Sequence, residues 1–249
     1  MARSLDPNRL EDLAQAGFRA FAEKGFRRTQ MADVARELGC SAGGLYKYVA
    51  SKEALFLLVL HRQNQDAVLT LPDELPVRAP TEEGFIVEVG KQLRRRVNMG
   101  KLQVAAEDEC PDDCSEEFEG IVRSIYQSLS KGRGVLILLE RSVGDWPELS
   151  TSYGGSTGRY IKRLKRYLEV RGAAGKLRVG PSAHASARLI AETCTWFAIR
   201  RPQLARPSGI DDAMAEETVV DTLCRAFLPA TGQSVNSKAP AKRRSQKAR

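Results

Sequence analysis

Residues 29–49 read TQMADVARELGCSAGGLYKYV, and three positions in this stretch predict two short helices that cross at a tight turn. Ala35 supplies the small side chain that such helices need where they cross. Gly39, four residues later, can adopt the positive φ that the turn requires. Leu45 is an apolar residue that would point from the second helix back into the protein. The spacing of these three residues predicts a helix-turn-helix.

The residues before this motif predict a longer helix. Asp6 is the expected N-cap, and Pro7 suits the first turn because a proline there loses no helical hydrogen bond. Gly25 suits the residue after the last turn, so we expect the helix to end there. The apolar residues between them recur at steps of three and four and form one stripe, which consists of Leu10, Leu13, Ala14, Gly17, Phe18 and Phe21.

Hydroxyl side chains precede each of the next three predicted helices. Thr29 and Ser41 are the expected N-caps of the two helices of the motif, over about residues 30–38 and 42–48. Ser51 can cap a fourth helix that continues to about residue 70. A fourth helix of this length would join the motif mechanically to the rest of the chain.

The remainder of the chain is also helical in pattern, and the expected fold class is all-α. Prolines at 72, 76 and 80 mark a loop, and residues 154–158 read as a flexible break. No convincing strand-like alternation flanked by hairpin turns is present. Further helices are expected over 82–99, 101–109, 116–131, 134–143, 147–171, 183–201 and 211–228.

The stretch from Gly25 to Leu55 resembles the DNA-binding half of the TetR family of transcriptional regulators. Its most distinctive part is Leu-Tyr-x-Tyr at 45–48, followed by Ser-Lys-Glu-Ala-Leu at 51–55. With the helix before this stretch, the resemblance covers about fifty residues, a fifth of the chain. The other matching residues are Gly25, Phe26, Thr29, Val34, Ala35, Gly39 and Ser41.

The resemblance implies roles in DNA binding for nine residues. Ser41, Ala42, Gly43 and Gly44 would enter the major groove at the start of the recognition helix. Thr29 would cap the preceding helix and offer its hydroxyl to a phosphate, and Lys52 would contact a phosphate at the start of the fourth helix. The remaining three, which would contact bases or phosphates, are Tyr46, Lys47 and Tyr48.

Two adjacent glycines, Gly43 and Gly44, depart from the family pattern, in which larger residues are common at these positions. Two glycines in a helix cost about 2 kcal/mol relative to alanine, and they offer no side chain to a base. Direct base readout should then fall on Ala42, Tyr46 and Lys47. Our hypothesis is that the glycines let the backbone approach the wall of the groove closely.

The resemblance further implies two domains with different functions. Residues 1–58 would form a three-helix DNA-binding domain, and residues 59–229 a helical domain for effector binding and dimerisation. The helices over 183–201 and 211–228 would pair between two subunits in a four-helix bundle. The expected function is that of a homodimeric repressor that binds a palindromic operator in double-stranded DNA and leaves it when a small-molecule effector of unknown class binds. An effector-independent DNA-binding protein and a helical enzyme are the alternatives.

Candidate effector-binding residues are aromatic or apolar side chains of the larger part. Such side chains could line a ligand cavity, although they belong more often to the core or to an interface. The main candidates are Met99, Tyr126, Trp146, Tyr153, Tyr160, Trp196 and Phe197. Val104, Leu129 and Leu136 are further candidates.

The net charge of +8 does not by itself predict DNA binding. Six of these charges lie in residues 230–249, a tail without acids that we expect to be disordered. The tail either adds nonspecific DNA affinity or acts only as a solubilising terminus.

Cysteine usage and apolar content predict a reduced, cytoplasmic protein without a membrane span. The five cysteines are odd in number, and no long apolar region follows Met1. Cys110 and Cys114 lie beside eight acidic residues within 107–119, but no histidine or second cysteine pair completes a zinc spacing, so no metal or cofactor is expected. No phosphate-binding glycine loop or nucleophile elbow points to an enzyme.

Overall fold

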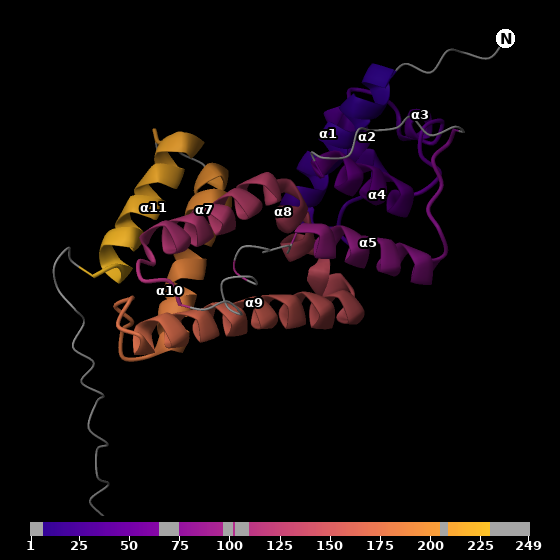
Figure 1. Cartoon of the computed structure of the whole chain (residues 1–249). Helices are drawn as coiled ribbons and strands as arrows, with labels where there is room; N and C mark the ends of the chain where they lie inside the picture. Colours follow the sequence, from indigo (N-terminus) through magenta and orange to yellow (C-terminus); the bar gives the residue numbers. More distant parts are fainter. Residues whose placement is uncertain (1–6, 65–74, 97–101, 103–109, 205–208, 230–249) are drawn as a thin grey trace, which may run out of the picture. The chain divides into compact units, whose positions relative to one another are not determined.

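The computed structural model describes residues 7–64, 75–96, 102, 110–204 and 209–229. Within these ranges the chain is helical, and an isolated bridge pairs Val49 with Val77 (Figure 1). The prediction of an all-α fold is confirmed. None of the described helices has the length and apolar character that a membrane crossing requires.

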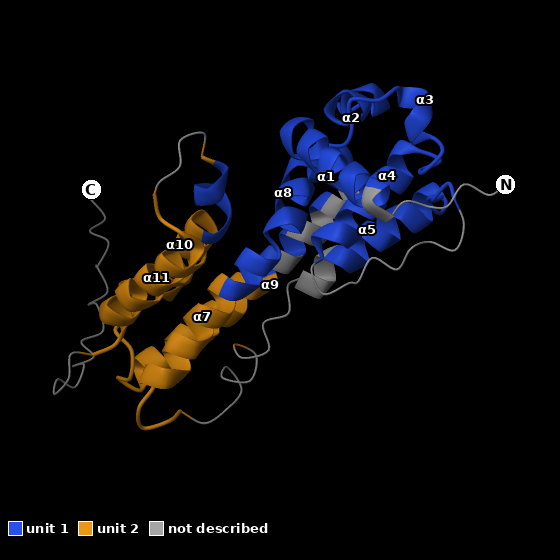
Figure 2. Ribbon diagram, turned by 90° about the horizontal axis from the view of Figure 1, so that it is seen from above, with its two compact units in different colours: residues 1–98, 127–158, 198–203 blue, residues 99–126, 159–197, 204–249 orange. Residues whose placement is uncertain are grey.

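The chain divides into two compact units, shown in blue and orange in Figure 2. Unit 1 combines residues 1–98, 127–158 and 198–203, and unit 2 combines residues 99–126, 159–197 and 204–249. Unit 1 therefore adds helices from the middle of the chain to the helix-turn-helix. The functional boundary expected near residue 58 stays a prediction.

The core of unit 1 lies between three helices, α1 (Pro7–Lys24), α4 (Lys52–Gln63) and α8 (Arg133–Ser142). The apolar stripe predicted for α1 is confirmed. Gly17 brings α1 close to α4, because a Cβ atom at this position would lie 2.8 Å from a methyl carbon of Val59. The side chains that fill this core include Leu10, Leu13, Phe21, Leu55, Phe56, Leu60, Val135 and Leu138.

The helix-turn-helix consists of α2 (Met31–Glu37) and α3 (Ala42–Leu45). Ala35 and Leu45 are buried, and Gly39 has a φ of +63° at the turn. The predicted use of these three residues is confirmed. The two helices of the motif pack on each other, and α2 also packs on α1.

The prediction that the second helix runs over 42–48 is wrong, because α3 ends at Leu45. Residues 46–48 form a turn, in which the amides of Tyr48 and Val49 donate to the carbonyl oxygen of Leu45 at 2.9 and 3.1 Å, and the amide of Ala50 then donates to the carbonyl oxygen of Val77 at 2.8 Å. A long-range backbone contact therefore competes with a further helical turn. The low helix propensity of two glycines in α3 also favours the early end.

The turn between α1 and α2 is held by the end of α8 and by a short 3₁₀ turn, η1 (Val143–Asp145). Gly25 has a φ of +78°, which confirms its predicted place after the helix. The amide of Phe26 donates to the hydroxyl of Ser142 at 3.1 Å, and the amide of Arg27 donates to the carboxylate of Asp145 at 2.9 Å. Residues more than 110 positions apart in sequence thus position the start of the DNA-binding motif.

The remaining helices follow the predicted pattern, with three differences. They are α5 (Glu82–Arg96), α7 (Ser115–Lys131), α9 (Pro147–Ala173), α10 (Ala183–Thr195) and α11 (Asp212–Phe227). First, α4 ends at Gln63 with Asn64 as its C-cap, short of the expected residue 70, although residues 65–70 lie outside the described ranges. Second, the expected break at 154–158 is wrong, since α9 continues through it. Third, the helix expected over 183–201 is α-helical only to Thr195, and it is followed by a π turn (Trp196–Arg200) and a 3₁₀ turn (Arg201–Gln203).

Unit 2 contains a buried ion pair between α9 and α7. The guanidinium of Arg171 is almost fully buried and donates to both carboxylate oxygens of Glu117, at 3.0 and 3.1 Å. The hydroxyl of Tyr167 donates to the same carboxylate at 2.9 Å. Because removing one partner would leave a buried charge unpaired, this cluster specifies how the two helices pack. The predicted helix over 101–109 and the basic tail lie outside the described residues.

Candidate DNA-binding site

The start of α3 has the cap that the sequence predicted. Ser41 has extended backbone angles, and its hydroxyl oxygen accepts a hydrogen bond from the amide of Gly44 at 3.3 Å. Ser51 acts in the same way at α4, where its hydroxyl oxygen accepts from the amide of Ala54 at 3.2 Å. Both caps confirm the predictions made for these serines and set the directions in which α3 and α4 leave the turns.

The residues around α3 alternate between an inner and an outer face. Leu45 is buried and anchors the helix, whereas Tyr46 keeps 48% of its surface exposed, and Ser41, Gly43 and Lys47 are also exposed. Three further predicted contact residues, Ala42, Gly44 and Tyr48, are half-buried beside them. The outer face therefore carries a hydroxyl, a phenol and an ammonium group next to exposed backbone, which are groups that contact phosphates and base edges.

Neither glycine of α3 is required by packing within the protein. A Cβ atom built on Gly43 would meet no atom within 4 Å, and one on Gly44 would lie at an ordinary 3.5 Å from the hydroxyl oxygen of Ser41. Neither residue has the positive φ that favours glycine. The isolated protein thus has room for side chains at both positions.

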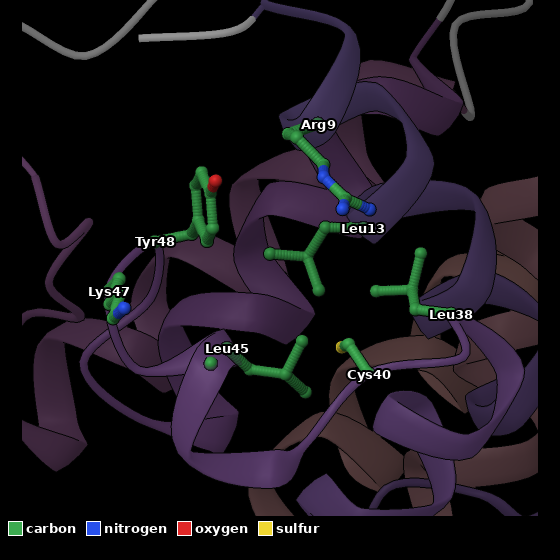
Figure 3. Close-up of a pocket in the computed structure, with 8 residues that line it drawn as sticks. Arg9, Leu13, Leu38, Cys40, Leu45, Lys47 and Tyr48 are labelled. Atoms are coloured by element: carbon green, nitrogen blue, oxygen red, sulfur yellow. The ribbon is translucent and has the colours of Figure 1, made fainter. Parts of the chain in front are cut away.

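A hollow of about 190 Å³ lies beside α3, between α1 and the motif (Figure 3). Leu13, Leu38 and Leu45 form its apolar floor, and Arg9 and Lys47 supply two positive charges at its margin. Arg9 was missed by the sequence analysis. It lies in the first turns of α1, remote in sequence from the motif, and only the packing of α1 against the motif brings it here.

Thr29 does not cap α2, and that prediction is wrong. The N-cap is Gln30, whose amide donates to the carboxylate of Asp33 at 2.9 Å. Thr29 is buried, and its hydroxyl donates towards the carbonyl oxygens of Gly25 at 2.7 Å and Ala20 at 3.2 Å. The Thr29 hydroxyl, which was expected to contact a phosphate, thus donates to backbone carbonyl oxygens at the end of α1.

Replacing Thr29 by valine should destabilise the protein by about 1 kcal/mol, the usual net value of a buried hydrogen bond, because the shape is kept and the hydroxyl is lost. Thr29→Ser, which retains the hydroxyl, should lose less of this stability. Urea unfolding followed by circular dichroism measures both. Unchanged stability of Thr29→Val together with weaker DNA binding would restore the phosphate-binding role.

Lys52 also makes contacts within the protein. Its ammonium group donates to the carbonyl oxygens of Thr29 at 3.1 Å and Arg27 at 3.3 Å. The same nitrogen lies 4.5 Å from the ring centre of Phe26. Lys52 thus ties the start of α4 to the α1–α2 turn, and its predicted phosphate contact would have to use the donor that remains.

Comparison with known proteins identifies this arrangement. Residues 13–59, which run from α1 into α4, match the family model described as bacterial regulatory proteins of the tetR family. Residues 13–59 therefore have the sequence of a TetR-family DNA-binding region. No protein of curated function matches it in sequence.

Solved structures agree with this TetR assignment at the level of the fold. The ketosteroid transcriptional regulator KstR2 of Mycobacterium tuberculosis has a TM-score of 0.55 and 17% identity, with 91% of this chain and 98% of that chain covered. AibR, in complex with isovaleryl coenzyme A and operator DNA, has a TM-score of 0.51 and 15% identity, with 88% and 100% covered. The described chain therefore has the fold of a TetR-family DNA-binding regulator.

The predicted effector residues are divided between the two units. Trp146 belongs to unit 1, and its ring centre lies 4.6 Å from that of Phe26. Tyr126, Tyr160, Trp196 and Phe197 belong to unit 2, where the last two rings meet edge to face at 4.8 Å. Met99 and the side chain of Tyr153 lie outside what the structure describes.

Cys110 and Cys114 belong to the acidic region that the sequence analysis considered for metal binding. Both sulfur atoms lie near the carbonyl oxygen of Pro111, at 3.7 and 3.9 Å. Burial raises the pKa of the Cys114 thiol to about 12, so this thiol is protonated at neutral pH. Within the described ranges, no group of three histidine, cysteine, aspartate or glutamate residues could hold a metal.

Proposed function

We propose that this TetR-family protein is a homodimeric repressor that binds a palindromic operator through α3 and leaves it when a small effector binds. The observation that carries the proposal is the outward face of α3, where Ser41, Gly43, Tyr46 and Lys47 are exposed around the buried Leu45. The site of action would be the cytoplasm, where the operator is accessible.

In the proposed complex, α3 lies in the major groove and its neighbours contact the backbone. Tyr46 and Lys47 have the reach for bases or phosphates, and Ala42 can contact a thymine methyl group. Arg9 is added to the predicted contacts, because it lines the same hollow as Lys47. Two copies of the site would read half-sites about one helical turn apart.

Exposed apolar side chains support the proposed dimer surface. Leu189 and Trp196, seven residues apart on α10 and its π turn, keep 57% and 45% of their surface exposed. Met214 on α11 is exposed to 56%. A run of large apolar groups on one helix face is typical of a protein–protein interface.

A charge on this surface should dissociate the dimer. We expect Leu189→Glu to raise the dissociation constant at least about a hundredfold, since an unpaired carboxylate would be buried in an apolar contact. Sedimentation velocity over a concentration series measures this. Val87→Glu changes an equally exposed apolar residue on α5 and should leave the mass unchanged. A wild-type monomer, or an unaffected Leu189→Glu dimer, would contradict the proposed interface.

Effector control is the finer part of the proposal. The hydroxyl of Tyr160 is buried, and within the described part of the chain it lacks a hydrogen-bond partner. Burial raises the pKa of this phenol, so it stays protonated and can donate to a ligand. AibR, which has a similar fold, is known in complex with isovaleryl coenzyme A and operator DNA. Effector and DNA would favour different conformations here, with a coupling of about 1–3 kcal/mol.

Fluorescence anisotropy with a labelled duplex from upstream of the protein's own gene tests the function. Lys47→Ala and Tyr46→Ala should weaken specific binding, and Lys47→Ala should also reduce its salt dependence by about one ion if Lys47 contacts a phosphate. Lys162→Ala, an exposed lysine on α9, is the matched control. Equal affinity of all variants for specific and random duplexes would refute the site. Specific binding that no small molecule releases would leave an effector-independent DNA-binding protein.

A further inference from the structure

Unit 1 contains an aromatic cluster that joins the DNA-binding motif to α5 and η1. The ring centre of Trp146 lies 4.6 Å from that of Phe26 and 5.4 Å from that of Phe85, and Phe26 and Phe85 are 5.7 Å apart. Phe85 is buried, and Trp146 is half-buried. Three rings from distant parts of the sequence thus meet at the surface of this unit.

These rings form one side of a half-open hollow of about 480 Å³. This volume is in the range of sites that hold small organic ligands. The remaining wall comes from the starts of α4 and α5 and includes Ser51, Glu53 and Glu82. The hollow therefore combines aromatic faces with two carboxylates and is distinct from the hollow beside α3.

The two carboxylates are not neutralised by other side chains of the described chain. No ion pair or hydrogen bond joins the side chain of Glu53 or Glu82 to another described residue. Each lies in the first turn of its helix, where the partial positive charge of the helix end is about half a unit. The residues that line the hollow thus include two acidic side chains and no basic one, which favours a cation over an anion.

The aromatic cluster already accepts one positive group. The ammonium nitrogen of Lys52 lies 4.5 Å from the ring centre of Phe26, within the distance of a cation–π contact. Tryptophan offers the strongest such contact of the aromatic residues. Within the described residues, the ring of Trp146 has no cation over its face. The site thus places an aromatic ring that holds no cation from the described chain next to two carboxylates without a partner there.

We propose that this hollow binds a small organic cation, an alkylammonium or quaternary ammonium compound. Rings and carboxylates together favour a charge spread over methyl groups, because such an ion is weakly hydrated and loses little on leaving water. A metal ion would require several oxygen ligands in place of its water, and the three aromatic rings supply none. The inference uses the geometry of unit 1 alone and does not depend on DNA binding.

Isothermal titration calorimetry of the full chain with (3-hydroxypropyl)trimethylammonium tests the site at constant ionic strength. We expect saturable binding at about millimolar concentration, the range of a few cation–π and charge contacts. The neutral isostere 4,4-dimethylpentan-1-ol should bind at least about tenfold more weakly, because it has a similar shape without the charge. Equal binding of the two compounds, or no saturable binding of the cation, would overturn the proposal.

Variants locate the site. Glu53→Gln/Glu82→Gln should weaken binding of the cation about tenfold, whereas Glu83→Gln, its exposed neighbour on α5 that does not line the hollow, should not. In the Trp196→Phe background Trp146 is the remaining tryptophan, and its emission should change with the same binding curve. Binding that leaves this emission unchanged, or that Glu83→Gln weakens as much as the double variant, would place the cation elsewhere and refute the site.

Discussion

The double variant Gly43→Ala/Gly44→Ala should bind operator DNA roughly tenfold or more weakly than the wild type, while its unfolding temperature rises. The space around both residues is open in the isolated protein, so two methyl groups cause no clash there. Each alanine favours the helix by up to about 1 kcal/mol. The same methyl groups would stand between the backbone of α3 and the groove wall, and a loss of tenfold corresponds to about 1.4 kcal/mol.

The opposite signs of the two effects make this prediction specific. Anisotropy with the operator duplex gives the affinity, and thermal unfolding by circular dichroism gives the stability. Gly158→Ala is a matched control, since Gly158 is an exposed glycine of α9 and a Cβ atom there would meet nothing within 4 Å. This control should gain stability and keep its affinity. If the double variant bound as tightly as the wild type, the idea of close backbone approach would be wrong.

The second large effect concerns the joint between α8 and the DNA-binding motif. Gly25→Ala should destabilise the protein by about 2–5 kcal/mol, the sum of a conformational cost and a steric cost. A side chain at a φ of +78° costs about 1–2 kcal/mol. The new Cβ atom would also lie 2.6 Å from the carbonyl oxygen of Arg141. Relieving that contact requires a backbone shift at the end of α8, for which overpacking costs of about 1–3 kcal/mol are typical.

Gly39→Ala separates these two causes. Gly39 has a similar φ of +63°, but a Cβ atom there would meet nothing within 4 Å. It should therefore lose only the conformational part, about 1–2 kcal/mol. Urea unfolding of both variants gives the difference that the Arg141 contact contributes. Equal destabilisation of the two variants would show that the contact with the Arg141 carbonyl oxygen adds no steric cost.

Local signals in the sequence predicted the motif well. Ser41 and Ser51 precede helices whose first amides need an acceptor, and both act as caps. Gly25 and Gly39 take the positive φ that few other residues tolerate. Each of these outcomes depends on a handful of neighbouring residues, which is why a short stretch of sequence sufficed.

Residues with more than one possible partner were predicted less well. Thr29 and Lys52 could serve DNA or the protein, and in the structure both contact backbone carbonyls around the α1–α2 turn. The expected break at 154–158 is a continuous helix, because the residues on both sides of these glycines are helical and the helix tolerates them. Arg9 could not be placed at the site from its position in the sequence.

The sequence alone determined the turn at Gly39, the cap at Ser41 and the buried anchor at Leu45, since these features depend mainly on close neighbours. The tertiary structure decided where α3 ends, what surrounds Phe26 and which charges face the two hollows. The contacts involved are made by residues that lie outside the motif in sequence, namely Val77, Ser142, Asp145 and Trp146. Such contacts follow from how the helices pack, and no local pattern of residues specifies them.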